Sequence, residues 1–210
     1  MKDFRKIFVA TTNPGKFKEL SEMLDEEIAW VSLKDFPETQ PVIEDGRTFE
    51  ENARKKAVGY AKQTGLWTIA DDSGLVIDDL NGQPGVQSAR FAGSKDSDRK
   101  IVDRKNYEKV LSLLKNIQPE KRTARFICHL CLASPEKILI ETEGTLEGLI
   151  IDRPIGENGF GYDPIFFVPR FNKTVAQLSS EEKNSISHRG QAVRKLKPLL
   201  QKLLNEQNPV

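Results

Sequence analysis

The sequence holds few of the features that mark secreted or membrane proteins. It has only two cysteines, Cys128 and Cys131, in 210 residues, which is too few for the disulfide scaffold of a small secreted protein. No stretch approaches the roughly 18 apolar residues that span a bilayer. Residues 1–6 lead straight into a short apolar segment, so we expect no signal peptide. The expectation is a cytoplasmic protein without a membrane partner.

An excess of charge of one sign is also missing. The chain has 32 Lys and Arg residues against 31 Asp and Glu residues, a formal net charge of +1. This balance gives no general attraction to nucleic acids or anionic membranes, and no basic stripe typical of a nucleic-acid-binding module is visible. Binding of a polyanionic ligand would therefore depend on a local cluster of residues.

Helical and strand patterns alternate along the chain and predict an α/β protein, with residues 1–210 as one domain. The predicted strands, including a hairpin that turns at Ser134–Pro135, are 6–10, 28–32, 67–70, 75–77, 122–133, 137–146 and 165–168. Helices are predicted after Gly15, from Thr48 to Gly65, within 96–114 and over 189–205. The apolar side of the last helix is expected to carry Val193, Leu196, Leu199, Leu200 and Leu203.

The segment Thr11-Thr12-Asn13-Pro14-Gly15-Lys16 joins the first strand to the first helix. A loop at a helix N-terminus exposes backbone N–H groups that suit phosphate, and Lys16 would add a positive charge. The segment lacks the full P-loop pattern, because Phe17 stands where Ser or Thr would bind magnesium. Its ordinary alternative is a helix-capping turn with a solvated lysine.

Two adjacent carboxylates, Asp71 and Asp72, precede Ser73-Gly74 and are expected to end the strand 67–70. Paired carboxylates repel each other unless a cation lies nearby, and hard divalent ions prefer oxygen ligands. One of them could also accept a proton from an attacking water. The alternative is an ordinary turn. Glu44, just before the second helix, becomes a metal-ligand candidate in the company of Asp72, although acidic residues near helix starts often serve the helix dipole.

Two later segments suit a flat, polar ligand. Phe160-Gly161-Tyr162-Asp163 places aromatic rings among glycines, and aromatic faces stack on nucleobases. His188 and Arg189 could read the hydrogen-bonding edge of a purine, and Lys183 could hold phosphate or a base oxygen. The alternatives are a tight turn with core aromatic residues and the polar start of the last helix.

Other polar motifs are expected to have structural roles. Glu51 is expected to cap the second helix together with Thr48. Cys128 and Cys131 have C-x-x-C spacing, but on a strand such side chains point to opposite faces. No second cysteine pair completes a zinc site.

The order of these motifs along the chain is specific. Together they resemble the inosine/xanthosine triphosphate pyrophosphatase family, also called the HAM1-like family, over nearly the whole chain. The segments that carry the resemblance are Thr11–Lys16, Thr48–Ala53, Ala70–Leu75, Pro84–Phe91, Phe160–Pro164 and Ser187–Gly190. The resemblance implies an elongated mixed sheet with flanking helices and two lobes around a central active-site cleft. It also implies a homodimer that hydrolyses ITP, dITP and XTP to the monophosphate and pyrophosphate.

The resemblance also implies roles for individual residues. Thr11, Thr12, Asn13, Pro14, Gly15 and Lys16 would hold the triphosphate. Glu44 and Asp72 would hold Mg²⁺, Asp72 would be the general base, and Ser73 would contact the substrate. The base pocket would be lined by Phe160, Gly161, Tyr162 and Asp163 and completed by Lys183, His188 and Arg189. Because a metal-bound carboxylate is a weaker base, Asp71 is considered as a second proton acceptor.

Three alternatives remain open on sequence alone. Maf-like nucleotide pyrophosphatases have a related architecture and act on other modified nucleotides, although the pair His188-Arg189 favours purines. A nucleotide sensor would bind a nucleoside triphosphate without cleaving it, which the paired acids Asp71-Asp72 argue against. A nucleic-acid-binding module is disfavoured by the balanced charge.

Overall fold

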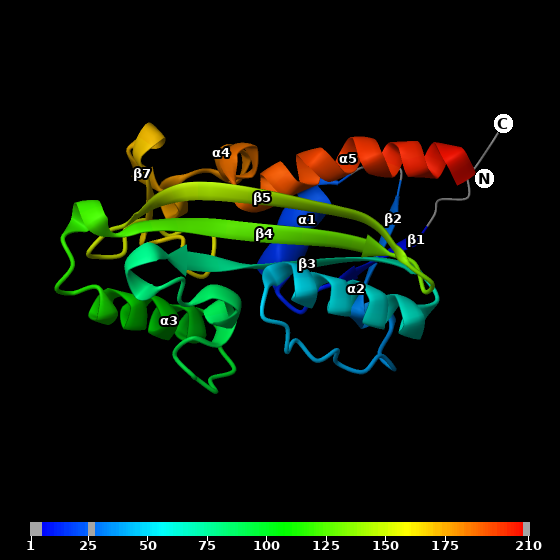
Figure 1. Ribbon diagram of the computed structural model, residues 1–210, viewed down its shortest axis with the longest axis horizontal. Coiled ribbons are helices and arrows are strands. Elements are labelled where there is room, and N and C mark those ends of the chain that lie inside the picture. The colour runs from blue at the N-terminus through cyan, green and yellow to red at the C-terminus, as the bar shows by residue number, and fades with distance from the viewer. Residues whose placement is uncertain (1–5, 25–27, 208–210) are drawn as a thin grey trace. The chain divides into compact units, whose positions relative to one another are not determined.

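The computed structural model describes residues 6–24 and 28–207 and confirms the α/β class (Figure 1). Within these residues an open, mixed sheet contains seven strands, in the order β2 (Ala29–Ser32), β1 (Lys6–Ala10), β3 (Trp67–Ile77), β4 (Thr123–Ala133), β5 (Ile138–Ile150), β6 (Phe166–Val168) and β7 (Lys173–Thr174). Strand β1 pairs in parallel with β2 and β3. Strand β6 pairs antiparallel with β5 and β7.

The helices follow the predicted pattern with one addition. They are α1 (Pro14–Met23), α2 (Phe49–Thr64), α3 (Arg99–Leu113), α4 (Ser180–Ile186) and α5 (His188–Gln207). Helix α4 was not predicted, because its 7 residues are too few to display a helical period. Among the helices of the described residues, none is long and apolar enough to cross a membrane.

The chain divides into two compact units. The first contains the described parts of residues 1–72, 128–144 and 189–210, and the second contains residues 73–127 and 145–188. The boundaries fall inside β3, β4 and β5, so each of these strands contributes to both units. Asp72 is the last residue of its segment in the first unit, and Ser73 opens the second unit.

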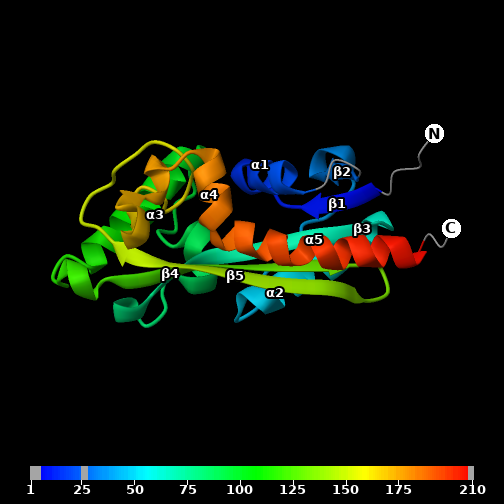
Figure 2. The same ribbon diagram turned by 90° about the horizontal axis from the view of Figure 1, so that it is seen from above.

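In the first unit, helices cover both faces of the strands. Helix α5 runs along the direction of β5 on one side, and α2 lies on the other (Figures 1 and 2). The alternation of side chains along β4 supplies both interfaces. Leu130 and Leu132 join the buried cluster that contains Leu196 of α5, whereas Cys131 and Ala133 join the cluster that contains Ala57 of α2.

The two cysteines lie on opposite faces of β4, as predicted. Cys128 belongs to the cluster on the α5 side, and Cys131 belongs to the cluster on the α2 side. Both are buried free thiols. Burial raises the pKa of Cys131 to about 12 and that of Cys128 well above the usual value.

One residue of the predicted apolar face of α5 is wrongly assigned. Val193, Leu196 and Leu200 are buried, and Leu203 packs partly against the same core. Leu199, in contrast, is 47% exposed. Positions 193, 196, 200 and 203 follow the helical period of three to four residues, and position 199 falls outside that stripe.

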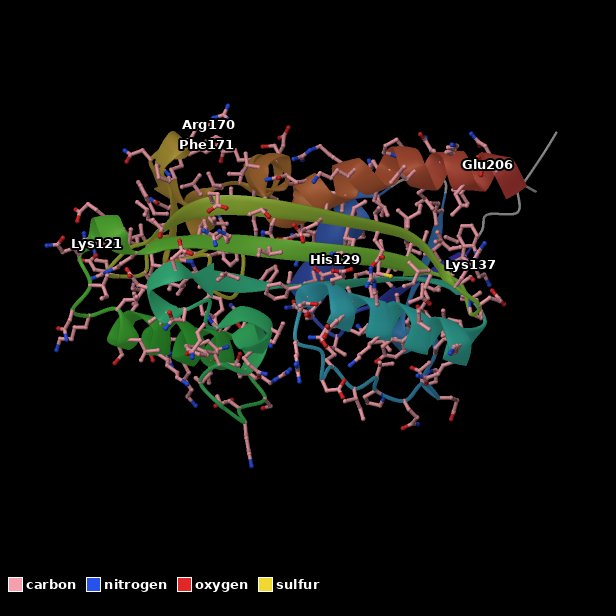
Figure 3. The ribbon with its side chains drawn as sticks, viewed as in Figure 1. Lys121, His129, Lys137, Arg170, Phe171 and Glu206 are labelled. Atoms are coloured by element: carbon pink, nitrogen blue, oxygen red, sulfur yellow. The ribbon has the colours of Figure 1, made fainter. Side chains whose placement is uncertain are left out.

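Ionic contacts tie α2 to the hairpin formed by β4 and β5. Arg54 Nε and Nη2 donate to the two carboxylate oxygens of Glu141 at 2.7 and 2.8 Å. His129 Nε2 lies 3.1 Å from Glu141 Oε1. Figure 3 labels His129 beside β4, and Lys137 at the turn where Ser134 N–H donates to the Lys137 carbonyl at 2.8 Å. These contacts fix the helix that carries Lys56 against the sheet.

The second unit has a separate core around α3. Val110 of α3 and the adjoining Leu114 pack with Leu75 and Ile77 of β3 and with Phe126 of β4. Two polar residues of the same helix, Asp103 and Asn106, are also buried.

The predicted break in β3 does not occur. Asp71, Asp72, Ser73 and Gly74 lie inside one continuous 11-residue strand, instead of ending a strand at residue 70 and starting another at Leu75. Their turn-like composition is overridden, because side chains from other elements pair with the two carboxylates and make their burial tolerable.

Candidate active site

The loop between β1 and α1 is shaped by Asn13. Its side-chain Oδ1 accepts hydrogen bonds from the N–H groups of Gly15 and Lys16 at 2.9 and 3.4 Å, as an N-cap residue does. An anion at this helix end would have to compete with Asn13 for these two donors. The Asn13 side chain therefore already satisfies the donors on which the predicted phosphate binding was based, and Lys16 supplies the positive charge of this segment.

Asp71 is the centre of a buried ionic cluster in the first unit. Its Oδ1 lies 2.6 Å from Lys16 Nζ, and its Oδ2 accepts from Arg189 Nε and Nη2 at 3.0 and 2.8 Å. Cys128 Sγ also donates to Oδ2 at 3.3 Å. Arg189 in turn donates through Nη1 to Glu19. Asp71 thus joins Lys16 of α1 to Arg189 in the first turn of α5.

The electrostatics of Asp71 argue against a role in accepting protons. Burial by itself would raise the pKa of Asp71, but the positive charges of Arg189, Lys16 and Lys56 outweigh burial and hold it well below its usual value. A carboxylate that stays ionised so strongly is a weak base. The lowered pKa makes Asp71 the less suitable proton acceptor of the two, and its contacts hold Lys16 and Arg189.

Asp72 has different neighbours although it is adjacent in sequence. Its Oδ2 accepts from Asn52 Nδ2 at 3.2 Å, and its Oδ1 accepts from Lys56 Nζ at 3.2 Å. Burial raises the pKa of Asp72, the charge of Asp71 adds to this, and Lys56 and Lys16 oppose it. A raised pKa makes Asp72 the better proton acceptor of the pair.

Glu44 and Asp72 converge on one positive centre. Lys56 Nζ lies 2.9 Å from Glu44 Oε2 and 3.2 Å from Asp72 Oδ1. Two carboxylates directed at one cation form a donor set that suits a hard divalent ion, because Mg²⁺ usually takes one or two protein carboxylates and keeps water and phosphate as its other ligands. Among the described residues, no group of three or more His, Cys, Asp or Glu side chains forms a metal site.

Lys56 and Asn52 are site residues that sequence reasoning missed. Both are buried on the side of α2 that also buries Phe49, Ala53 and Ala57. The sequence did contain a signal, because the helical period places these two residues on the apolar face of the helix. Polar side chains buried there need polar partners. Asn52 also accepts from the Gly46 N–H at 2.8 Å.

Close approach explains the glycine at position 46. A Cβ atom there would lie 2.6 Å from Asn52 Oδ1 and 2.8 Å from the Glu51 Cβ. The absence of a side chain lets the segment that carries Glu44 pass close to the start of α2.

The capping of α2 is only partly as predicted. Thr48 Oγ1 accepts from the Glu51 N–H at 3.1 Å. The carboxylate of Glu51, however, accepts from the Arg47 N–H at 2.6 Å, one residue before the expected donor. Glu51 is exposed and holds the entry to the helix rather than closing a full capping box with Thr48.

In the second unit, Asp163 organises the glycine-rich aromatic loop. Its Oδ2 accepts from the Phe160 N–H at 2.9 Å and from Lys183 Nζ at 2.6 Å. Lys183 Nζ lies 4.5 Å from the centre of the Phe160 ring. Three of the predicted base-pocket residues are therefore in contact, and they combine an aromatic face with a buried positive charge.

Gly159 is required by this arrangement. Its φ angle of +75° is in the left-handed region, and a Cβ atom would lie 2.0 Å from Asp163 Oδ2 and 3.2 Å from Lys183 Nζ. The backbone at Gly159 therefore passes close to the Asp163–Lys183 ion pair, and any side chain at this position would collide with it.

The remaining predicted residues fall in both units. His188 stacks on Phe126, with ring centres 4.9 Å apart. Ser73 is half-buried and opens the second unit. Arg189 belongs to the first unit and is 1% exposed, with its guanidinium on Asp71 and Glu19. The sequence had indicated only a base-reading role for Arg189, and its hold on Asp71 was missed.

Comparisons with known proteins agree with the order of these motifs. The family model of the Ham1 family matches residues 7–199. The chain is 49% identical over 199 residues to a dITP/XTP pyrophosphatase of Bacillus cereus, covering 93% of this chain and 95% of that protein. It is 50% identical over 198 residues to a dITP/XTP pyrophosphatase of Bacillus subtilis, covering 94% and 98%.

Solved structures give the same answer for the fold. A HAM1 protein from Coxiella burnetii matches with a TM-score of 0.84 at 41% identity, covering 95% of this chain and 100% of that chain. The Ham1 protein of Staphylococcus aureus matches with a TM-score of 0.82 at 40% identity, covering 94% and 99%. With a family match over nearly its whole length, this chain belongs to the Ham1 family.

Proposed function

We propose that this chain hydrolyses noncanonical purine nucleoside triphosphates such as dITP, ITP and XTP to the monophosphate and pyrophosphate, which would cleanse the nucleotide pool. The observation that carries the proposal is the meeting of Glu44 and Asp72 at Lys56, in the same unit as the Lys16–Asp71 ion pair. The names of the relatives, dITP/XTP pyrophosphatase, support the substrate class.

Asp72 would act as the general base. Its raised pKa and its hydrogen bonds from Asn52 and Lys56 hold a carboxylate of increased basicity in one orientation. It would take the proton of an attacking water while one bridging P–O bond breaks and pyrophosphate leaves. General-base assistance of this kind contributes about two to four orders of magnitude in rate.

Lys16 and Lys56 would bind the phosphates. Lys16 is 15% exposed at its side chain, and Asp71 fixes its ammonium group. Positive charges held in place stabilise the negative charge of a triphosphate without reorganising during the reaction. Lys56 would contribute a second charge while it keeps Glu44 and Asp72 together.

Glu44 and Asp72 would hold Mg²⁺. The support is the donor set itself, two carboxylates that already share one cation. When bound, Mg²⁺ would offset phosphate charge and polarise the phosphoryl oxygens.

The aromatic loop of the second unit would select the base. The Phe160 ring offers a stacking face, and Lys183 offers a buried donor beside it. A donor suits the 6-oxo group of hypoxanthine or xanthine, whereas the 6-amino group of adenine would set a donor against a donor. His188, in the same unit, is proposed to complete this recognition, and Ser73 is proposed to contact the substrate. Arg189 is proposed instead to hold Asp71, because its buried guanidinium pairs with Asp71 and Glu19.

The homodimer is proposed from the family resemblance alone, and the cytoplasmic location is proposed from the composition of the sequence. Light scattering of the purified protein tests the dimer. A monomer at the concentrations used for assay would contradict it.

A substrate panel with product analysis tests the proposed function. The full chain is assayed with Mg²⁺ against ITP, dITP, XTP, ATP, GTP, UTP and dUTP, and pyrophosphate is separated from phosphate. We expect pyrophosphate from the first three substrates at far higher kcat/KM than from ATP or GTP. Preference for UTP or dUTP would favour the Maf-like alternative, and binding without pyrophosphate release would favour a nucleotide sensor.

Isotopically labelled water extends the same assay. The label must enter either the monophosphate or the pyrophosphate, because hydrolysis adds one water across the broken P–O bond. Its position therefore identifies the phosphorus that is attacked.

A further inference from the structure

Helix α3 carries two buried polar side chains that hold loops rather than pack against apolar neighbours. Asp103 is 8% exposed and Asn106 is 1% exposed, three residues apart on the helix. Buried polar groups need hydrogen-bond partners. In both cases these partners include backbone groups of segments outside the helix.

Asn106 holds the segment that leads into α3. Its Oδ1 accepts from the Ala92 N–H at 2.8 Å, and its Nδ2 donates to the carbonyls of Ser88 and Ala89, both at 3.3 Å. Ser88 belongs to a short 3-10 helix, Gly85–Arg90. One side chain thus fixes three backbone groups of this segment.

Asp103 holds the aromatic loop in the same way. Its Oδ2 accepts from the Gly161 N–H at 2.8 Å, and its Oδ1 lies 3.0 Å from Arg99 Nε. Gly161 has a φ angle of +65°, which leaves its conformation dependent on such contacts. A hydrogen bond to an ionised carboxylate is stronger than one between neutral groups.

Tyr162 joins the two held segments. Its hydroxyl donates to the Ser88 carbonyl at 2.8 Å, the same oxygen that Asn106 contacts. The residues on either side of Gly161 are therefore Tyr162, anchored to Ser88, and Phe160, which contacts Asp163 and Lys183.

We propose that Asp103 is a positioning residue for the base pocket. By accepting the Gly161 N–H it sets the angle at which the Phe160 ring faces Lys183, and so it sets the affinity for the purine. The proposal rests on the proposed function, because it assigns the base pocket to this loop. Asp103 would touch neither the substrate nor the reacting phosphate.

Steady-state kinetics of Asp103→Ala test the proposal. We expect KM for ITP to rise about tenfold, the effect of losing one good hydrogen bond, while kcat stays within about twofold. The preference for ITP over ATP should fall in parallel. A KM equal to that of the wild type, or a loss confined to kcat, would overturn the proposal.

Two further variants, which involve Arg99 and Asp103, separate the role of Asp103 as a hydrogen-bond acceptor from that of its negative charge. Arg99→Ala removes the partner of Oδ1 and leaves the Gly161 hydrogen bond, so KM should stay near the wild-type value. The double variant Arg99→Ala with Asp103→Asn keeps an acceptor for Gly161 without a charge, and it should recover most of the lost affinity. If KM of the double variant were as high as that of Asp103→Ala, the negative charge of Asp103 and not its hydrogen bond to Gly161 would set the affinity, which would contradict the proposal.

Hydrogen exchange provides a readout that does not need turnover. Exchange at the Gly161 amide should become faster in Asp103→Ala and stay slow in the double variant. If Asp103→Ala does not fold, Tyr162→Phe serves instead, because it removes the hydrogen bond from the Tyr162 hydroxyl to the Ser88 carbonyl. KM for ITP is then expected to rise about threefold, less than the full effect of one hydrogen bond. Unchanged exchange, or unchanged KM in Tyr162→Phe, would contradict the network. Failure of the proposed function would instead appear as a wild-type protein that releases no pyrophosphate.

Discussion

Asp71 and Asp72 are adjacent on β3, yet their pKa values are displaced in opposite directions. Burial favours the protonated form of both. The positive charges of Arg189, Lys16 and Lys56 outweigh burial at Asp71 and lower its pKa. At Asp72, burial and the negative charge of Asp71 outweigh Lys56 and Lys16 and raise the pKa. Consecutive residues of a strand point to opposite faces, so the two carboxylates meet different charged neighbours.

Asp72→Asn should abolish turnover without unfolding the protein. The amide cannot accept the proton of water, so kcat should fall by about two to four orders of magnitude. Because ionising the buried Asp72 is unfavourable, the variant should also have a melting temperature at least equal to that of the wild type at neutral pH. Initial rates and thermal melts measure the two effects, and near-normal turnover would remove Asp72 from its role.

Asp71→Asn should destabilise the fold in a pH-dependent way. Removing one partner of a buried ionic cluster costs about 3–5 kcal/mol. A carboxylate whose pKa is lowered by folding adds stability above its unfolded pKa of about 3.9, and this contribution is lost as the pH falls through the folded value. The difference in unfolding free energy between wild type and variant should therefore be constant above about pH 5 and shrink below about pH 4.

Urea unfolding at a series of pH values measures this difference. Asp79→Asn is the matched control, because Asp79 is an exposed residue just beyond the end of the same strand. A destabilisation by Asp71→Asn that stays constant down to the acid transition would contradict the assignment.

Lys16→Ala should weaken binding of the triphosphate. Loss of a charge-assisted contact predicts a rise in KM of about one to two orders of magnitude. Lys18→Ala is the control, since Lys18 lies on the same helix with its side chain 70% exposed and paired with Glu22 in an i,i+4 contact. Equal KM values in the two variants would place Lys16 outside the phosphate site.

Glu44→Gln should raise the Mg²⁺ concentration needed for half-maximal activity. Loss of one charged ligand worth ~1.4 kcal/mol corresponds to about a tenfold increase. The lost activity should return at high Mg²⁺, which distinguishes this variant from Asp72→Asn. Asp45→Asn is the control, because Asp45 is exposed and pairs with Lys55 at 2.5 Å. An unchanged Mg²⁺ dependence in Glu44→Gln would exclude it as a ligand.

Gly159→Ala should impair the base pocket through steric conflict. Gly159 and Gly93 both have positive φ angles, +75° and +68°, but an added Cβ meets Asp163 only at position 159. Both substitutions incur backbone strain of about 1–3 kcal/mol, so both melting temperatures should fall, and that of Gly159→Ala should fall further because its Cβ also collides with Asp163. KM for ITP should rise in Gly159→Ala and stay near normal in Gly93→Ala, and a similar KM in both would contradict the crowding argument.

The sequence predicted the elements well where local signals and tertiary packing agree. The helix predicted after Gly15 is found as α1, although it already starts at Pro14 with Asn13 as its cap, and Gly65, with a φ angle of +71°, ends α2 as predicted. The same local signals failed at residues 71–74. There, partners from α1, α2 and α5 satisfy two carboxylates and let the strand continue, and these contacts cannot be read from the strand itself.

The acidic residues and loops of the candidate site could be predicted from the sequence, but the side chains that position them could not. A lysine inside a helix usually lies in solvent, so burial of Lys56 was not predicted, although the helical period places it on the same face as Ala53 and Ala57. Asp103 and Asn106 were hidden in a helix of mixed charge for the same reason. Their roles depend on backbone groups more than ten residues away, which no local pattern encodes.

The burial of both thiols on opposite faces of β4 has a practical consequence. With Cys128 and Cys131 enclosed and their pKa values raised by burial, the folded wild-type chain should react slowly with maleimide reagents. A single cysteine introduced at an exposed position such as Glu157 would then carry a fluorophore or spin label without prior removal of native thiols.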